Sequence, residues 1–226
     1  MPAPKALFFD VFGTCVDWRA SVTRAAAAYG LQPGFADDWR ARYQPQMETV
    51  RSGARPWTVL DVLHRESLDE LLAAYEVDLT EEQRAELNLA WHRLDPWPDA
   101  VEGLTRLKER FVIAPVSNGN IALIVDMAKH AGLPWDVVLG AEVARAYKPR
   151  PEAYLRSAEA LGIAPGEAMM VAAHNDDLIA AGAIGLMTAF VPRPTEHGPG
   201  QTTDLRAAGA YDVVATDFVD LARALG

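Results

Sequence analysis

From Asp99 to the end of the chain, segments with the pattern of strands alternate with segments with the pattern of helices. Short apolar runs, the expected strands, lie at 111–116, 137–139, 168–172, 187–191 and 212–214. Most of them are separated by stretches whose apolar residues recur at helical spacing. Such alternation builds right-handed βαβ units, whose parallel sheet is covered by helices on both faces. The sequence therefore predicts an α/β fold.

The first 96 residues contribute one strand and then a long helical block. Residues 5–11 form a short apolar segment closed by Gly13-Thr14, as expected of a strand buried on both faces. Residues 17–94 contain helical patterns only, including the capping box Thr80-Glu-Glu-Gln83. Two prolines in the segment 95–99 then interrupt any helix. We therefore expect a core of residues 1–16 and 97–226, with an all-helical domain inserted at 17–96.

Composition restricts the partners and the compartment. The chain has 226 residues, half of them apolar, and a net charge of −10 without any Lys/Arg-rich run, so we expect no nucleic-acid partner. The N-terminal apolar run is only four residues long, which predicts neither a signal peptide nor a membrane span. The single cysteine, Cys15, cannot form an intrachain disulfide, and we read it as a small buried residue. These features predict a cytoplasmic protein.

Four polar clusters follow the apolar strands. They are Asp10-Val-Phe-Gly-Thr14, Ser117-Asn118-Gly119, Lys148-Pro149 and His174-Asn-Asp-Asp177. Each cluster alone is typical of a turn or a helix cap. However, ligands of open parallel sheets bind at the carboxyl ends of the strands, where all four clusters would meet. Their conjunction predicts a reaction site made of an acid, a hydroxyl group, a cation and a second acid.

The order of these clusters resembles the four motifs of the haloacid dehalogenase superfamily, and the helical block resembles its cap domain. The resemblance covers essentially the whole chain. It implies a Rossmann-like sheet, a nucleophilic Asp10, and catalytic roles for Lys148 and Asp177. Within the superfamily, the chain looks most like the L-2-haloacid dehalogenase group.

Two positions separate carbon–halogen cleavage from phosphoryl transfer. Most members of the superfamily carry a second aspartate two residues after the nucleophile, where this chain has Phe12. A phenyl ring cannot transfer the proton that a leaving alkoxide needs, whereas a halide needs none. In addition, Trp39-Arg40 resembles the cap pair whose arginine receives the departing halide, although Arg42 is a second candidate. Trp57 has two interpretations: it forms a wall of the halogen pocket, or it is an ordinary core residue.

The remaining candidates would bind the substrate carboxylate or arrange the nucleophile. Thr14 and Ser117 can hydrogen-bond either group, and the amides near Asn118 can cradle an anion at a helix N-terminus. The fourth motif departs from the Ser-x-Asn pattern commonly described for these dehalogenases. It resembles a His-Asn-x-Asp sub-branch, in which His174 stands in for the asparagine, and this leaves the roles of His174 and Asn175 open.

We therefore interpret the chain as a hydrolytic dehalogenase of short 2-haloacids that works through an aspartyl ester. No metal or cofactor is expected, and the ligands are a small anionic haloacid and a halide ion. One alternative is a phosphatase or phosphonatase-like enzyme that binds magnesium through Asp10, the carbonyl of Phe12, and Asp176 or Asp177. A non-catalytic binding protein is a third interpretation. The resemblance also implies a homodimer formed through cap helices.

Overall fold

A six-stranded parallel sheet forms the centre of the protein. The computed structural model describes residues 3–226. The strand order is β5-β4-β1-β6-β7-β8, and every neighbouring pair is parallel. The strands are β1 (Ala6–Phe9), β4 (Val112–Ser117), β5 (Leu139–Gly140), β6 (Ala168–Ala172), β7 (Met187–Phe190) and β8 (Val213–Val214). The predicted α/β fold is confirmed.

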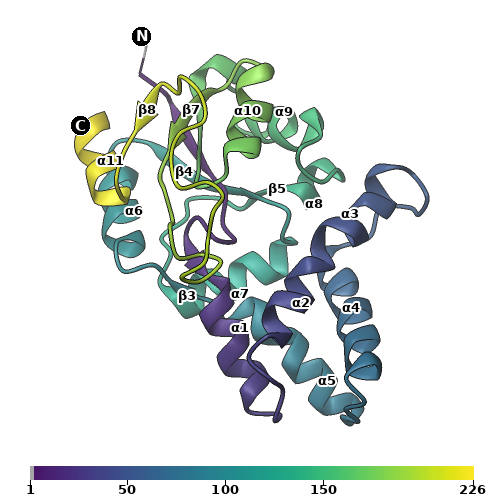
Figure 1. Ribbon diagram of the computed structural model, residues 1–226. Coiled ribbons are helices and arrows are strands. Elements are labelled where there is room, and N and C mark those ends of the chain that lie inside the picture. The colour runs from purple at the N-terminus through teal and green to yellow at the C-terminus, as the bar shows by residue number, and fades with distance from the viewer. Residues whose placement is uncertain (1–2) are drawn as a thin grey trace.

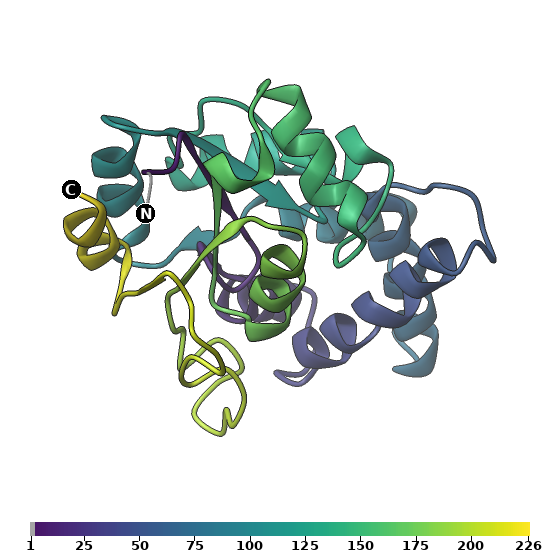
Figure 2. The ribbon, with the colours of Figure 1, turned by 90° about the horizontal axis from the view of Figure 1, so that it is seen from above.

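Helices cover both faces of this sheet (Figures 1 and 2). Every residue of β1 is buried, with Leu7 and Phe9 in one apolar cluster and Ala6 and Phe8 in the other. This explains why the strand is a continuous apolar run and does not alternate with polar residues. The first cluster includes residues of α6 (Ala100–Lys108), α7 (Ile121–Ala131), α8 (Ala141–Ala144) and α11 (Phe218–Leu225). The second includes residues of α9 (Pro151–Ala160) and α10 (Asn175–Ala183).

The segment between β1 and α6 is helical, as expected. It contains α1 (Trp18–Ala27), α2 (Phe35–Ala41), α3 (Tyr43–Arg51), α4 (Leu60–Ala74), α5 (Glu81–Asn88) and a 3₁₀ turn (Leu89–His92). Thr80 and Gln83 form the predicted capping box of α5. A two-stranded antiparallel ribbon of β2 (Val16–Asp17) and β3 (Asp95–Pro96) joins the two ends of the segment. The division into a core and a cap domain at these residues stays a prediction.

Two expected helices differ from the structure in ways that matter for the site. The expected helix 35–50 is split at Arg42 into α2 and α3. Pro45 has no N–H to donate to the carbonyl group of Ala41, so a continuous helix would lose a hydrogen bond there. The expected helix 178–184 begins at Asn175 instead, so Asp177 lies in its first turn.

No helix within residues 3–226 is both long enough and apolar enough to cross a membrane.

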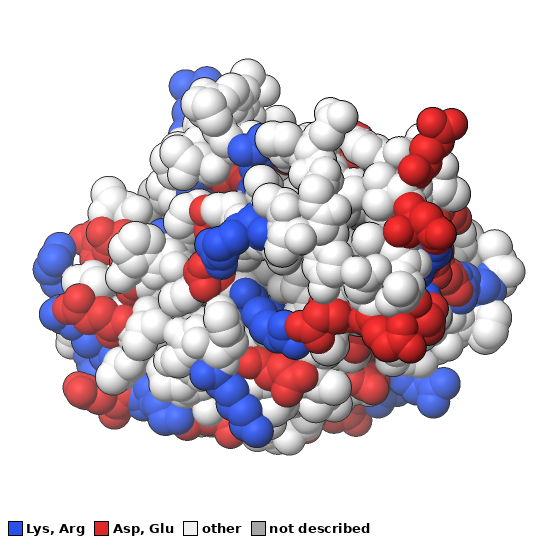
Figure 3. All heavy atoms as spheres, turned by 90° about the horizontal axis from the view of Figure 1, so that it is seen from below, with Lys and Arg blue, Asp and Glu red and all other residues white. Residues whose placement is uncertain are grey.

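Acidic and basic side chains are interspersed over the face shown in Figure 3, where the described residues form no extended basic area. Near the middle of that face, Lys and Arg side chains lie beside a hollow together with Asp and Glu side chains. This distribution fits the binding of a small anion better than the binding of a nucleic acid.

Candidate active site

Asp10 lies directly after β1, the strand between β4 and β6, and its carboxylate is buried. Lys148 Nζ donates a hydrogen bond to Oδ1 at 2.8 Å. Thr14 Oγ1 donates to Oδ2 at 2.7 Å and itself accepts the N–H of Ala173 at 2.9 Å. Burial alone would raise the pKa of Asp10, but Lys148 and His174 lower it far below its usual value. Asp10 is therefore ionised and held at two oxygens.

Lys148 joins the first carboxylate to a second one. Its Nζ also donates to Oδ2 of Asp177 at 2.5 Å, and the hydroxyl of Tyr154 donates to Oδ1 of Asp177 at 2.5 Å. The backbone N–H of Lys148 donates to Oδ1 of Asn118 at 2.7 Å. Burial would lower the pKa of Lys148, whereas Asp10 and Asp177 raise it, so the ammonium group keeps its charge. The three residues predicted to be catalytic thus form one hydrogen-bonded chain.

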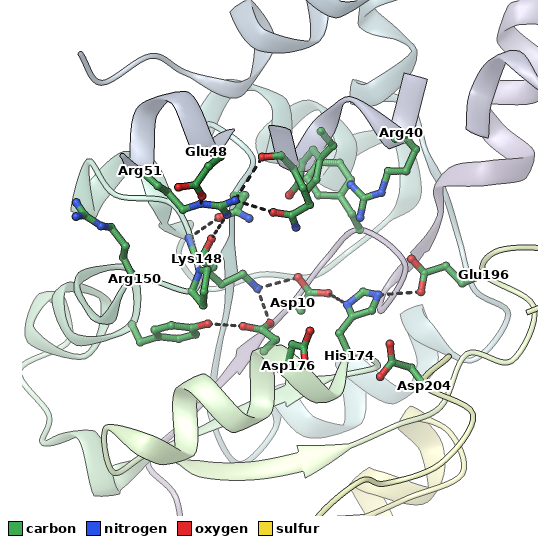
Figure 4. Close-up of a pocket in the computed structure, with 18 of the residues that line it drawn as sticks. Asp10, Arg40, Glu48, Arg51, Lys148, Arg150, His174, Asp176, Glu196 and Asp204 are labelled. Carbon is green, nitrogen blue, oxygen red and sulfur yellow. Dashed lines mark hydrogen bonds and ion pairs between the residues drawn. The ribbon is translucent and has the colours of Figure 1, made fainter. Parts of the chain in front are cut away.

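His174 supplies a second cation to Asp10. Its Nδ1 lies 2.9 Å from Oδ2 of Asp10, and its Nε2 lies 2.8 Å from Oε2 of Glu196 (Figure 4). Burial would lower the pKa of His174, but Glu196 and Asp10 raise it well above its usual value. The imidazole is therefore protonated and donates a hydrogen bond from each nitrogen.

Sequence reasoning missed Glu196 and Tyr154. Glu196 belongs to no motif and lies in the segment between β7 and β8, which has no helix or strand over residues 191–212. Connections of this length inside a compact domain often carry function, so the length of this segment was the signal that could have pointed to Glu196. Tyr154 lies in α9, where its spacing fits an ordinary core residue, so the pattern offered no such signal.

Arg40 reaches the site from the cap. It lies on α2, and its Cζ is 4.0 Å from the ring centroid of Tyr43 and 5.9 Å from that of Phe12. Its Nη1 is buried and has no hydrogen-bond partner among residues 3–226. Arg42 instead pairs with Glu70 at the protein surface. Of the two candidates for the halide, the structure therefore brings Arg40 to the site.

These side chains line one cavity of about 960 Å³ between the cap helices and the sheet. The cap contributes Arg40 and Tyr43, whereas Asp10 and Lys148 come from the core (Figure 4). Phe12 is buried and lines the same cavity, and its ring meets those of Tyr43 and Trp91 edge-on at 6.2 and 6.0 Å between centroids. The cavity combines an ionised carboxylate, a guanidinium nitrogen without a hydrogen-bond partner among residues 3–226, and an apolar wall.

Four residues predicted to bind substrate do not line this cavity. Thr14 holds Asp10, as described above. Ser117 is fully buried, and its Oγ accepts the N–H of Gly119. Trp57 packs on Tyr147, with the ring centroids 4.8 Å apart. The structure thus brings Thr14 to Asp10, which is one of its two predicted roles, and gives Ser117 and Trp57 partners away from the cavity.

Asn175 is the fourth. Its Nδ2 donates to Oδ1 of Asp204 at 2.6 Å and to the carbonyl of Arg206 at 3.1 Å. Its Oδ1 accepts the N–H of Ala208 and the hydroxyl of Tyr211, each at 2.8 Å. The side chain thus fastens the segment that follows Glu196 and does not reach toward Asp10.

The magnesium-binding alternative requires free carboxylate oxygens at the end of β1. Both oxygens of Asp10 instead accept hydrogen bonds from charged or hydroxyl donors, and so do both oxygens of Asp177. Among residues 3–226, no group of three or more His, Cys, Asp or Glu side chains could hold a metal ion. Lys148 Nζ stands between the two carboxylates, so this set of donors does not fit a divalent cation.

A comparison with protein families agrees with this geometry. The model of the haloacid dehalogenase-like hydrolases matches residues 4–185. The chain belongs to this family. In open α/β proteins, ligands bind at the carboxyl ends of the strands. In this haloacid dehalogenase-like hydrolase, Asp10 lies at that edge of the sheet, directly after β1.

Solved structures and a curated protein show which kind of enzyme within this family the chain resembles. A defluorinating L-2-haloacid dehalogenase has a TM-score of 0.95 and 52% identity, covering 98% of this chain and 95% of its own. Another L-2-haloacid dehalogenase has a TM-score of 0.96 and 46% identity, covering 99% and 100%. The (S)-2-haloacid dehalogenase 4A of Burkholderia cepacia is 30% identical over 196 residues, which are 84% of this chain and 83% of that protein.

Proposed function

We propose that this protein is a hydrolytic dehalogenase that converts short 2-haloacids into 2-hydroxy acids through an aspartyl ester. The observation that carries the proposal is the pairing of two groups in one cavity: the ionised carboxylate of Asp10 and the buried, unpaired Nη1 of Arg40. An always-charged guanidinium stabilises a halide that forms only as the bond breaks. The L-2-haloacid dehalogenases that resemble the chain over nearly all of its length support the same reaction.

In the first step, Asp10 displaces the halide from C2 of the substrate. Among the described residues, Oδ1 accepts a hydrogen bond from Lys148 alone, whereas Oδ2 accepts from both Thr14 and His174. Oδ1 is therefore the freer oxygen and forms the bond to C2, and the halide takes the bonding electron pair toward Arg40. Because a halide needs no proton, the phenyl ring of Phe12 suits this leaving group.

The substrate carboxylate adds a negative charge beside the nucleophile. Two like charges about 4 Å apart repel by roughly 4 kcal/mol at an effective dielectric of 20, so cations must offset them. Lys148 and His174 supply these charges at Asp10. Asn118, one of the predicted substrate contacts that line the cavity, binds the backbone of Lys148.

In the second step, water attacks Cγ of Asp10 and gives a proton to Asp177. The pKa of Asp177 is raised, above all by burial, which makes its carboxylate a stronger base. When the bond between Cγ and Oδ1 breaks, Lys148 donates a proton to the departing alkoxide and regains one from Asp177. Asp10 then loses its proton to solvent. The sum is haloacid plus water to hydroxy acid, halide and one proton.

The test is halide release from both enantiomers of 2-chloropropionate and from chloro-, bromo- and fluoroacetate. Asp10→Asn serves as the control, and we expect it to abolish release. A single turnover in heavy-oxygen water should leave the label on Asp10, because the water oxygen enters its carboxylate. Release that survives Asp10→Asn, or an enzyme that stays unlabelled, would rule out the proposed route.

A further inference from the structure

The carboxylate of Glu196 is buried against His174 and takes no part in the steps above. Besides His174, it binds Trp18, whose Nε1–H donates to Oε1 at 2.9 Å. Gly13 lies against the same carboxylate at a backbone φ of +86°, and a Cβ at this position would overlap Glu196. The turn after β1 is thus shaped around a carboxylate that reaches Asp10 only through His174.

The charges around His174 change during the proposed reaction. In the resting enzyme, His174 lies between two carboxylates, Asp10 and Glu196, and both raise its pKa. Once Asp10 is an ester it carries no charge, so Glu196 is the remaining anion in direct contact with the imidazole. Burial then opposes the charged form of His174 with only one carboxylate to offset it.

Oδ2 of Asp10 is the carbonyl oxygen of the ester when Oδ1 forms the bond to C2. It becomes negatively charged when water attacks Cγ, and its donors are then Thr14 Oγ1 and His174 Nδ1. A charged donor stabilises an oxyanion more than a neutral one does. The protonation state of His174 therefore matters most in the second step.

We propose that Glu196 is a positioning residue that keeps His174 protonated after the ester has formed, so that Nδ1–H of His174 stabilises the oxyanion at Oδ2 during ester hydrolysis. This inference rests on the aspartyl-ester route proposed above. His174 keeps its proton throughout the step, so the balance of atoms given for ester hydrolysis is unchanged.

The experiment separates the two steps in Glu196→Gln, which removes the charge and keeps the size of the side chain. The charged or titratable groups around His174 in the wild type are Asp10, Glu196, Lys148, Asp176, Asp177, Arg40, His197 and Asp204. Of these, only Glu196 changes in the variant. We expect a rapid release of halide equivalent to the enzyme present, followed by ester hydrolysis at least about tenfold slower than in the wild type.

The pH dependence of ester accumulation distinguishes loss of the Glu196 charge from a change in the shape of the site. Without Glu196 and with Asp10 esterified, burial lowers the pKa of His174, so the imidazole loses its proton as the pH rises. Ester accumulation in Glu196→Gln, followed by intact-protein mass spectrometry, should increase from acidic to alkaline pH. In the wild type it should stay low across the same range.

Two further variants complete the test. His174→Gln keeps a neutral donor near Oδ2 and should accumulate ester at every pH, which also secures the result if Glu196→Gln folds poorly. Glu48→Gln removes a carboxylate from the rim of the same cavity, where Glu48 pairs with Arg51, and should not accumulate ester. If His174→Gln hydrolyses the ester at the wild-type rate, or Glu196→Gln shows no pH dependence, the inference is wrong. Halide release that still requires Asp10 would leave the proposed function standing.

Discussion

Lys148 Nζ lies 2.8 Å from Oδ1 of Asp10, although the two residues are 138 positions apart in the chain. The contact forms because β1 is a central strand and the segment that carries Lys148 follows β5 at the same edge of the sheet. An ammonium group at this distance compensates the burial of the Asp10 carboxylate.

Lys148→Met should therefore reduce kcat/KM by about 10²–10³-fold, the usual cost of losing one preorganised charge at a reacting group. Burial would then raise the pKa of Asp10, so the remaining activity should increase with pH over a range where the wild type is constant. The measurement is kcat/KM for chloropropionate as a function of pH. A parallel loss at every pH would mean that Lys148 does not control the ionisation of Asp10.

Arg40 and Arg42 offer a matched pair, since they lie two positions apart and only Arg40 lines the cavity. Arg40→Gln should slow halide release in a single turnover by about 10²–10³-fold, because the departing anion loses its charged partner. Arg42→Gln removes a surface ion pair and should change the rate by less than about twofold. Equal effects of the two substitutions would contradict the assignment of Arg40.

The raised pKa of His174 predicts how stability depends on pH. A histidine whose pKa is higher in the folded state stabilises the protein fully below its unfolded value, near 6.5, and loses this contribution as the pH rises. The pKa of His92 is also raised, because Asp61 and Asp126 outweigh its burial. The free energy of unfolding should therefore fall as the pH rises above about 6.5, and His174→Gln should retain only the part of this fall that is due to His92. Urea titrations at several pH values measure how the free energy of unfolding changes with pH in the wild type and in His174→Gln.

Removal of divalent cations should leave the dehalogenase activity unchanged, because the donors at Asp10 do not fit a metal ion. The measurement is halide release after treatment with a chelator and dialysis, compared with untreated enzyme and with enzyme supplied with magnesium. Loss of activity that magnesium restores would favour the phosphatase-like alternative.

The strand ends could be predicted from the sequence, because a buried parallel strand has a recognisable pattern: an apolar run that ends at a polar residue. Asp10 follows from this rule, whereas Lys148 and Asp177 were singled out by the resemblance to the superfamily motifs; the structure brings the three together. Glu196 could not be predicted, because its contact with His174 depends on the path of a long segment without regular structure. The alternatives for Trp57 and the role of Asn175 could not be decided from the sequence, because proximity to a motif does not decide which way a side chain points.

The homodimer and the cytoplasmic location stay predictions. They rest on the resemblance to the superfamily and on the single cysteine.

The groups proposed to make and break bonds lie near the carboxyl ends of the strands, whereas Arg40 lies on a helix of the inserted segment. Substitutions along α2 can thus alter the preference among leaving groups while Asp10, Lys148 and Asp177 keep their positions. In a lineage of such enzymes, the choice of halogen can drift or be selected independently of the chemistry of ester hydrolysis, and an engineer can vary it in the same way.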